Sequence, residues 1–221
     1  SRGLGDVYKR QNTMLRIRQA YVNLDWGKSA VLVGITWHPL FGAVMPDVLN
    51  LSTGAPFQPF NRSPQIRYQY KANSRVQLTA SVLWQLQYLS SGPKGMSEDY
   101  IKNSCIPEMF VGADFTPADG WLMGLGAHMI SLNPRTSTEW KEQTFKVNER
   151  MTAFSYEAHL KYSGRNYTFA AKTLMASALD HTALLGGYGV SSVDSRTGEQ
   201  GYTPFRHSTT CLLYTSPSPR D

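Results

Sequence analysis

The histidines are the first residues to consider for chemistry, because imidazole is the commonest metal ligand and a frequent general base. Their separations along the chain do not reproduce a ligand spacing such as HxxxH or HExxH. We therefore predict no metal site, no cofactor, no catalytic residue and no enzymatic activity. The five positions are His38, His128, His159, His181 and His207.

Polar residues at alternating positions are a stronger candidate for function. They share the polar side of segments in which apolar and polar residues alternate, so they would line the wall of a water-filled channel. Basic residues outnumber acidic ones among them, which would raise the local concentration of anions. The other interpretation is that they wet the wall and select nothing. The predicted pore-lining residues are Arg67, Lys71, Arg75, Gln77, Ser81, Gln85, Glu157, His159, Lys161 and Lys172.

The segment RVQLTASVLWQLQY, residues 75–88, shows this alternation most clearly. Every even position is apolar, and only Leu83 breaks the polar set at the odd positions. Because successive side chains of a strand point to opposite faces, the segment predicts one strand with an apolar and a polar face. Its length would be ~45 Å, which suits a tilted strand that crosses a bilayer.

Similar patterns predict an all-β chain, a partial antiparallel transmembrane β-barrel meander of eight or nine strands. The expected connections alternate between short ones of a few residues and long ones of about twenty. This alternation is typical of outer-membrane barrels, which have tight turns at one end and long loops at the other. The other predicted strands are residues 14–26, 30–37, 65–71, 108–115, 121–132, 151–162 and 166–179, with a ninth that begins near Tyr202.

The first long connection, residues 38–64, combines many apolar side chains with five prolines. The apolar surface is too large to leave in water, and the prolines exclude a central strand. Two interpretations stay open: the loop folds into the barrel mouth and narrows the pore, or it packs over a rim or across a trimer interface. For the first, Asp47, Asn61 and Arg62 are the predicted constriction residues.

Two stretches carry a family resemblance: LRIRQAYVNLDWGKSAVLVGITWHPLFG, residues 15–42, and DVLNLSTGAPFQPFNRSPQIRY, residues 47–68. Together with LLGGYGV (184–190) and GYTPFRHSTT (201–210), they resemble outer-membrane porins of the Bacteroidetes type, relatives of the trimeric DcaP-like porins. The resemblance implies a passive diffusion channel in the bacterial outer membrane, a homotrimer, and about sixteen strands in a complete barrel.

The two ends of the chain resemble the two strands of one translated sequencing adapter. We therefore expect residues 1–11 and 211–221 to be adapter-derived tags that make few specific contacts, with residues 12–210 as a partial porin barrel. Cys211 falls in the second tag, which leaves Cys105 without a partner for an internal disulfide.

Composition narrows the choice of function. The net charge is +6, but no run of Lys or Arg suggests a nucleic-acid partner. The sequence therefore predicts a porin for small hydrophilic solutes, leaning to anions, whose partners are outer-membrane lipid and other copies of itself. The alternatives are a non-conducting structural or adhesion barrel and a barrel-type hydrolase with a nucleophile in a loop.

Overall fold

The structure, a computed structural model, describes residues 18–42, 44 and 59–215. Nine strands form one antiparallel sheet in which every strand pairs with the next one of the set, as predicted. β1 and β15 are its two edges. The strands are β1 (Ala20–Asp25), β2 (Ser29–Trp37), β3 (Arg62–Lys71), β4 (Val76–Leu83), β7 (Glu108–Phe115), β8 (Trp121–Leu132), β11 (Met151–Ser163), β12 (Thr168–Ser177) and β15 (Arg206–Thr215).

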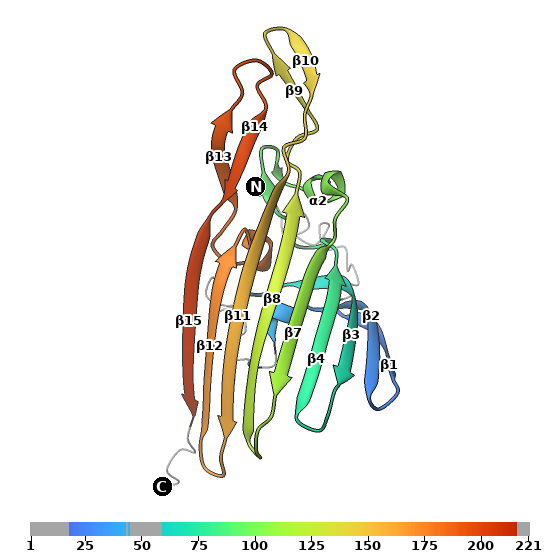
Figure 1. The fold of residues 1–221 in the computed structure, drawn as a ribbon, viewed down its shortest axis with the longest axis vertical. Coiled ribbons are helices and arrows are strands. Elements are labelled where there is room, and N and C mark those ends of the chain that lie inside the picture. Colours follow the sequence, from blue (N-terminus) through green and yellow to red (C-terminus); the bar gives the residue numbers. More distant parts are fainter. Residues whose placement is uncertain (1–17, 43, 45–58, 216–221) are drawn as a thin grey trace, which may run out of the picture.

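Tight turns and long connections lie at opposite ends of the sheet, which confirms the predicted alternation (Figure 1). The long connections hold all the smaller elements of the described chain. None of its helices is long and apolar enough to span a membrane. The smaller elements are η1 (Pro39–Phe41), the hairpin β5 (Ser91–Gly92) and β6 (Gly95–Met96), α2 (Asp99–Ser104), the hairpin β9 (Ser137–Trp140) and β10 (Gln143–Lys146), η3 (Asp180–Thr182), and the hairpin β13 (Tyr188–Val193) and β14 (Gln200–Pro204).

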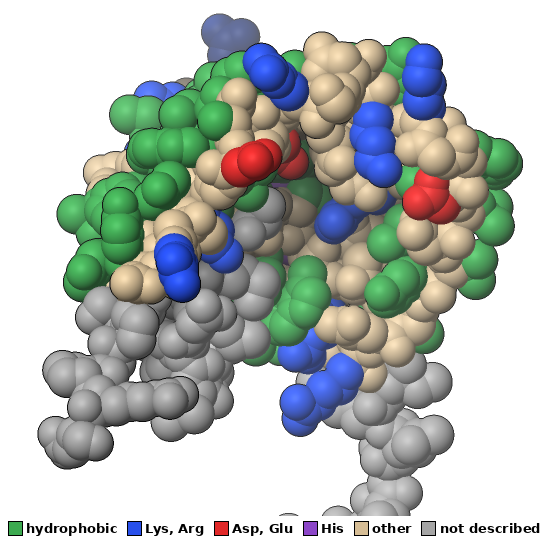
Figure 2. All heavy atoms as spheres, turned by 90° about the horizontal axis from the view of Figure 1, so that it is seen from below, with side chains coloured by type: hydrophobic (Ala, Val, Ile, Leu, Met, Phe, Trp, Pro, Cys, Tyr) green, Lys and Arg blue, Asp and Glu red, His purple; other side chains and the backbone are tan. Residues whose placement is uncertain are grey.

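The sheet is curved, and its two faces differ in chemistry as the alternation predicts. On β8, Leu125 is 67% exposed on the convex face, whereas His128 is 1% exposed on the concave face. On β11, Tyr156 is 54% exposed and Ser155 is fully buried. Seen from the tight-turn end, hydrophobic side chains gather on the outside of the curve, and polar and charged ones face the hollow (Figure 2).

The start of the β2–β3 connection lies inside this hollow. Lys172 on β12 donates hydrogen bonds from Nζ to the carbonyl oxygens of Leu40 and Phe41. Farther along, the Phe60 N–H donates to the carbonyl of Thr182 after β12, at 2.6 Å. Because β2 and β12 lie far apart in the strand order, these contacts cross the hollow. The described part of this connection, residues 38–42, 44 and 59–61, therefore packs against the inner wall. We call it the inserted loop.

A small apolar core joins that loop to the sheet. Leu40 packs with Leu83 on β4, Phe110 on β7 and Leu174 on β12, all of them buried, in one cluster that includes Leu184. Leu83 is the residue that interrupts the polar alternation of its strand. The structure explains the interruption, because Leu83 faces the inserted loop rather than water.

Several predicted boundaries are wrong. β12 covers Thr168–Ser177 rather than 166–179, and the ninth strand of the sheet begins at Arg206 rather than near Tyr202, which lies in β14. β4 ends at Leu83 rather than at residue 88, because the Gln85 side-chain carbonyl accepts the Ser90 N–H at 2.9 Å and the chain folds back there. Gln85 is thus buried beyond the strand rather than on it. The predicted loop 38–64 is also too long, since β3 starts at Arg62 and includes Pro64, whose carbonyl accepts the Trp84 N–H.

The expectation of few contacts for residues 211–221 is wrong for its first part. β15 continues to Thr215, and its backbone pairs with β12 as far as Thr168. Leu212 and Tyr214, each 67% exposed, continue the outward apolar alternation, so the strand has no reason to stop at residue 210. Residues 1–11 and 216–221 lie outside the described part of the chain.

Candidate functional site

The hollow contains a cavity of about 240 Å³ below the inserted loop. Its upper boundary is the turn after β2, with Trp37, His38 and Pro39. Four of the predicted pore-lining residues come together on its wall: Arg67, Gln77, Glu157 and His159. The face on which they lie follows from strand alternation, but their meeting at one depth follows from the register of the strands.

The remaining predicted pore-lining residues lie elsewhere. Lys71 and Arg75 are exposed at the tight-turn end, where they line a shallower depression with Gln77 and Asp114. Lys161 is half-buried on β11, and Ser81 is buried on β4 without a hydrogen-bond partner for Oγ. Lys172 and Gln85 are buried and bond to other groups of the protein, so these two do not face free solvent.

His159 forms a small charged group on the wall of the cavity. Its Nε2 lies 3.1 Å from Asp114 Oδ1, and its Nδ1 lies 3.3 Å from the Glu157 carboxylate. Gly124 on β8 makes room for it, because a Cβ there would be 2.3 Å from the imidazole and 2.5 Å from the Asp114 carboxylate. The group holds one histidine between two carboxylates and fixes the imidazole against the sheet.

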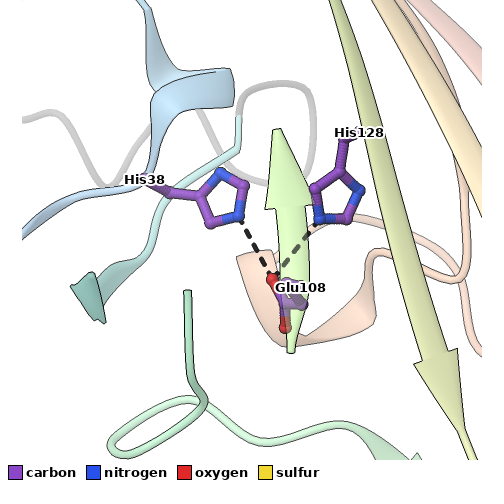
Figure 3. A group of neighbouring side chains, drawn as sticks. All are labelled: His38, Glu108 and His128. Carbon is purple, nitrogen blue, oxygen red and sulfur yellow. Dashed lines mark hydrogen bonds and ion pairs between the residues drawn. The ribbon is translucent and has the colours of Figure 1, made fainter. Parts of the chain in front are cut away.

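A second group, which we call the Glu108 cluster, lies higher in the hollow and consists of Glu108, His38, His128 and His181. His38 and His128 point their Nε2 atoms at Glu108 Oε2, at 3.3 and 3.4 Å (Figure 3). The His181 Nε2 lies 3.2 Å from the same carboxylate. All four side chains are at most 1% exposed.

Four different parts of the chain position the Glu108 cluster. Glu108 is the first residue of β7, and His128 lies on the neighbouring strand β8, opposite Phe110. His38 caps η1 by accepting the Leu40 N–H on Nδ1 at 3.2 Å. His181 lies in η3. The cluster thus joins the wall to both connections that enter the hollow.

The surroundings shift the pKa values of the two loop histidines, His38 and His181, in opposite directions. Complete burial lowers the pKa of His38 to about 4, although its hydrogen bond to Glu108 acts the other way. Burial also disfavours a charge on His181, but the Glu108 carboxylate outweighs this and raises the pKa of His181. Without a cation, the cluster therefore holds His38 neutral and favours a proton on His181.

The predicted constriction residues have structural contacts. Asn61 is fully buried, its carbonyl accepts the His38 N–H, and its Oδ1 accepts the Ser63 hydroxyl at 3.1 Å. Arg62 lies over the Trp37 ring, 4.2 Å from its centre. Asp47 lies outside the described residues.

Three of the five histidines, whose spacing along the chain has no ligand motif, come together around Glu108, a residue that the sequence analysis does not single out. No local spacing could reveal the group, because its members are separated by 20 to 73 residues from Glu108. One signal is present in the sequence. Glu108 occupies one of the alternating polar positions of its strand, so its side chain is expected on the face that lines the hollow. The chain matches no protein-family model, no curated protein and no solved structure.

Proposed function

We propose that this chain is part of the wall of a bacterial outer-membrane porin, a passive diffusion channel for small hydrophilic solutes. The observation that carries the proposal is the separation of the antiparallel sheet into an apolar convex face and a polar concave face. A sheet in lipid must pair all its backbone polar groups, which requires a closed barrel. Its apolar face would contact lipid, and its polar face would line water.

The dimensions and the aromatic residues support a transmembrane wall. β8 has 12 residues and β11 has 13, enough for a tilted crossing that needs about 9–11. Three aromatic rings lie together at the tight-turn end: the ring centres of Trp121 and Tyr162 are 4.7 Å apart, and those of Tyr162 and Tyr167 are 5.5 Å apart, both pairs tilted. Aromatic girdles of this kind mark the membrane interface of barrels. We propose that about sixteen strands close the barrel, and that its partners are lipid and two further copies in a trimer.

The inserted loop supports a constriction rather than an interface between copies. Its described residues bond to Lys172 on β12 and pack with Leu83 and Phe110 on the inner wall. A loop held in this way reduces the open cross-section of the hollow. Solutes would then pass between the loop and the wall that carries Arg67.

The preference for anions rests on fewer residues than the sequence suggests. Lys172 is occupied by the loop carbonyls, and Glu108 and Asp114 add acidic groups on the concave face. Arg67 lines the cavity, and Lys71 and Arg75 lie at the tight-turn end. Like charges along one side of a narrow aqueous path favour counter-ions, so small carboxylates and phosphates are the solutes we propose.

Planar-bilayer recordings of the full-length protein test both parts of the proposal. We expect a stable, ohmic conductance, and we expect the triple variant Arg67→Gln, Lys71→Gln and Arg75→Gln to lower the anion-to-cation permeability ratio in a salt gradient. Lys141→Gln with Lys146→Gln, in the exposed β9–β10 hairpin, is the control. Conductance with an unchanged ratio would remove the anion preference and leave the porin.

A non-conducting structural barrel is the second candidate, and one observation favours it. Leu40, Phe41 and the Glu108 cluster are buried and fill the upper part of the hollow in the described chain. The same recordings separate the two functions, because a filled barrel in the bilayer gives no current above the lipid background.

A further inference from the structure

We propose that the Glu108 cluster is a structural site for one divalent transition-metal ion, with zinc as the reference ion, bound by His38, His128 and Glu108. One ligand atom of each of the three residues lies within 4.8 Å of the other two, and the Nε2 atoms of the two histidines lie 3.3 and 3.4 Å from Glu108 Oε2. Two histidines and one carboxylate are a common ligand set for such ions. This inference does not depend on the proposed channel function.

The distances fit a shared cation better than direct hydrogen bonds. A charge-assisted hydrogen bond between an imidazole and a carboxylate is about 2.7–2.9 Å long. The three contacts to Glu108 are 3.2 to 3.4 Å, all longer than that. Two ligand atoms that are each ~2.0–2.1 Å from a tetrahedral zinc ion are ~3.3 Å apart. The contacts of His38 and His128 with Oε2 therefore have the separation that a common metal ion requires.

Neighbouring groups hold the carboxylate in position. Gln85 Nε2 donates to Glu108 Oε1 at 2.8 Å, and the same amide nitrogen lies 2.8 Å from Ser90 Oγ. His181 approaches the carboxylate from η3. Oε1 thus accepts from Gln85, Oε2 lies 3.3 and 3.4 Å from the Nε2 atoms of His38 and His128, and the His181 Nε2 lies 3.2 Å from both oxygens. Hydrogen bonds that orient a ligating carboxylate in this way are the usual support of a metal site.

His38 must change its hydrogen bonding when it binds the ion. Its Nδ1 accepts the Leu40 N–H, so in the neutral form the proton is on Nε2. Coordination through Nε2 moves that proton to Nδ1, and the Leu40 N–H then loses its 3.2 Å bond. One long hydrogen bond at the start of η1 is exchanged for a metal bond, so the ion replaces the cap that holds the loop.

The site is structural rather than catalytic, because the side chains of its ligands are at most 1% exposed. Its ligands come from the inserted loop and from two adjacent strands. A bound ion therefore fixes the loop to the wall at a second point besides Lys172. Nitrogen and carboxylate ligands together favour a borderline ion such as zinc over calcium or magnesium.

The test is a metal titration of the intact chain in detergent, after treatment with EDTA and removal of the chelator. We expect one zinc ion per chain, bound at micromolar zinc, and a visible absorption spectrum of tetrahedral Co²⁺ when cobalt replaces zinc. Zinc should also raise the melting temperature. Glu108→Gln and His128→Asn should each weaken binding at least ~10-fold. His207→Asn, on β15 away from the cluster, is the matched control and should bind like the unmodified chain.

Two outcomes would overturn the proposal. One is an EDTA-treated chain that binds less than one equivalent and melts at the same temperature with and without zinc; this result needs no variant to fold. The other is binding that survives in both Glu108→Gln and His128→Asn. In either case the cluster is an ion pair between Glu108 and a protonated His181, without a metal. A conducting channel that binds no zinc would leave the porin proposal intact.

Discussion

Lys172→Met tests whether the inserted loop is fastened to the wall through one ammonium group. Lys172 is buried, and its Nζ donates to the Leu40 carbonyl and, at 3.0 Å, to the Phe41 carbonyl. A Cβ at Gly42 would be 3.3 Å from the same Nζ, so the loop backbone passes close to it. Methionine has a similar length but cannot donate, so the variant removes the two bonds with little change in volume.

The expected magnitude is a difference between two effects. A hydrogen bond to a charged group contributes ~1.5–3 kcal/mol, and two are lost. Part of this loss is offset because the variant no longer buries an ammonium ion, which costs several kcal/mol. We therefore expect the docked loop to lose ~2 kcal/mol of stability, within the usual range for a buried substitution. Because ~1.4 kcal/mol corresponds to a tenfold change, the undocked fraction should rise ~30-fold.

Amide hydrogen exchange of a peptide that covers residues 38–44 is the assay. The Leu40 and Phe41 N–H groups are bonded within the cap of η1 and should exchange ~30-fold faster in Lys172→Met. The control is Lys161→Met on the neighbouring strand β11, because the Lys161 side chain has no hydrogen bond in the described part of the chain. Equal exchange in the two variants would refute the reasoning and show that apolar packing alone holds the loop.

Three other substitutions follow from single contacts, and each is measured by urea unfolding in detergent. Leu83→Ala should destabilise the chain by ~2–5 kcal/mol, since it leaves a cavity between β4 and the loop, whereas Val82→Ala on the convex face should have a smaller effect. Gly124→Ala should destabilise it because the new Cβ would meet the His159 ring at 2.3 Å, and Ala127→Ser on the other face serves as the control. Arg135→Met should cost ~2 kcal/mol, below the ~3–5 of a fully buried pair, because Arg135 is 24% exposed while Glu149 is buried. A loss below ~0.5 kcal/mol in any of these would contradict the contact on which it rests.

The strands of the sheet and the face to which each side chain points could be predicted from the sequence. Alternation has a period of two residues, so a run such as Ile66, Tyr68 and Tyr70 identifies both the strand and its outward face. The bounds of β7 and β8 agree with the prediction at both ends. The predictions failed where a side chain redirects the backbone. Gln85 closes a turn by a hydrogen bond with Ser90, which the alternation of residues cannot predict. The predicted strand at residues 75–88 is therefore longer than β4.

The contents of the hollow could not be predicted in the same way. Parity assigns a residue to a face, but the depth at which it meets residues of other strands depends on register and on where the loops fold. His128 comes near Glu108 because Phe110 pairs with His128 across β7 and β8. His38 arrives through a loop that crosses the hollow, and no spacing along the chain predicts its contact with Glu108.

Burial by the inserted loop affects both the Glu108 cluster and the proposed anion preference. A polar side chain on the concave face counts toward selectivity only if water reaches it, and Glu108 and Lys172 are withdrawn from solvent by the same inserted loop. Removing both leaves Arg67, Lys71, Arg75 and Lys161 against Asp114 and the largely buried Glu157, and His159 lies between those two carboxylates. In the proposed channel, the basic excess on the path of a solute would thus lie on β3 and the turn that follows it. In the proposed channel, a loop that occupies the hollow would determine which charges a passing ion meets, as well as how wide the path is.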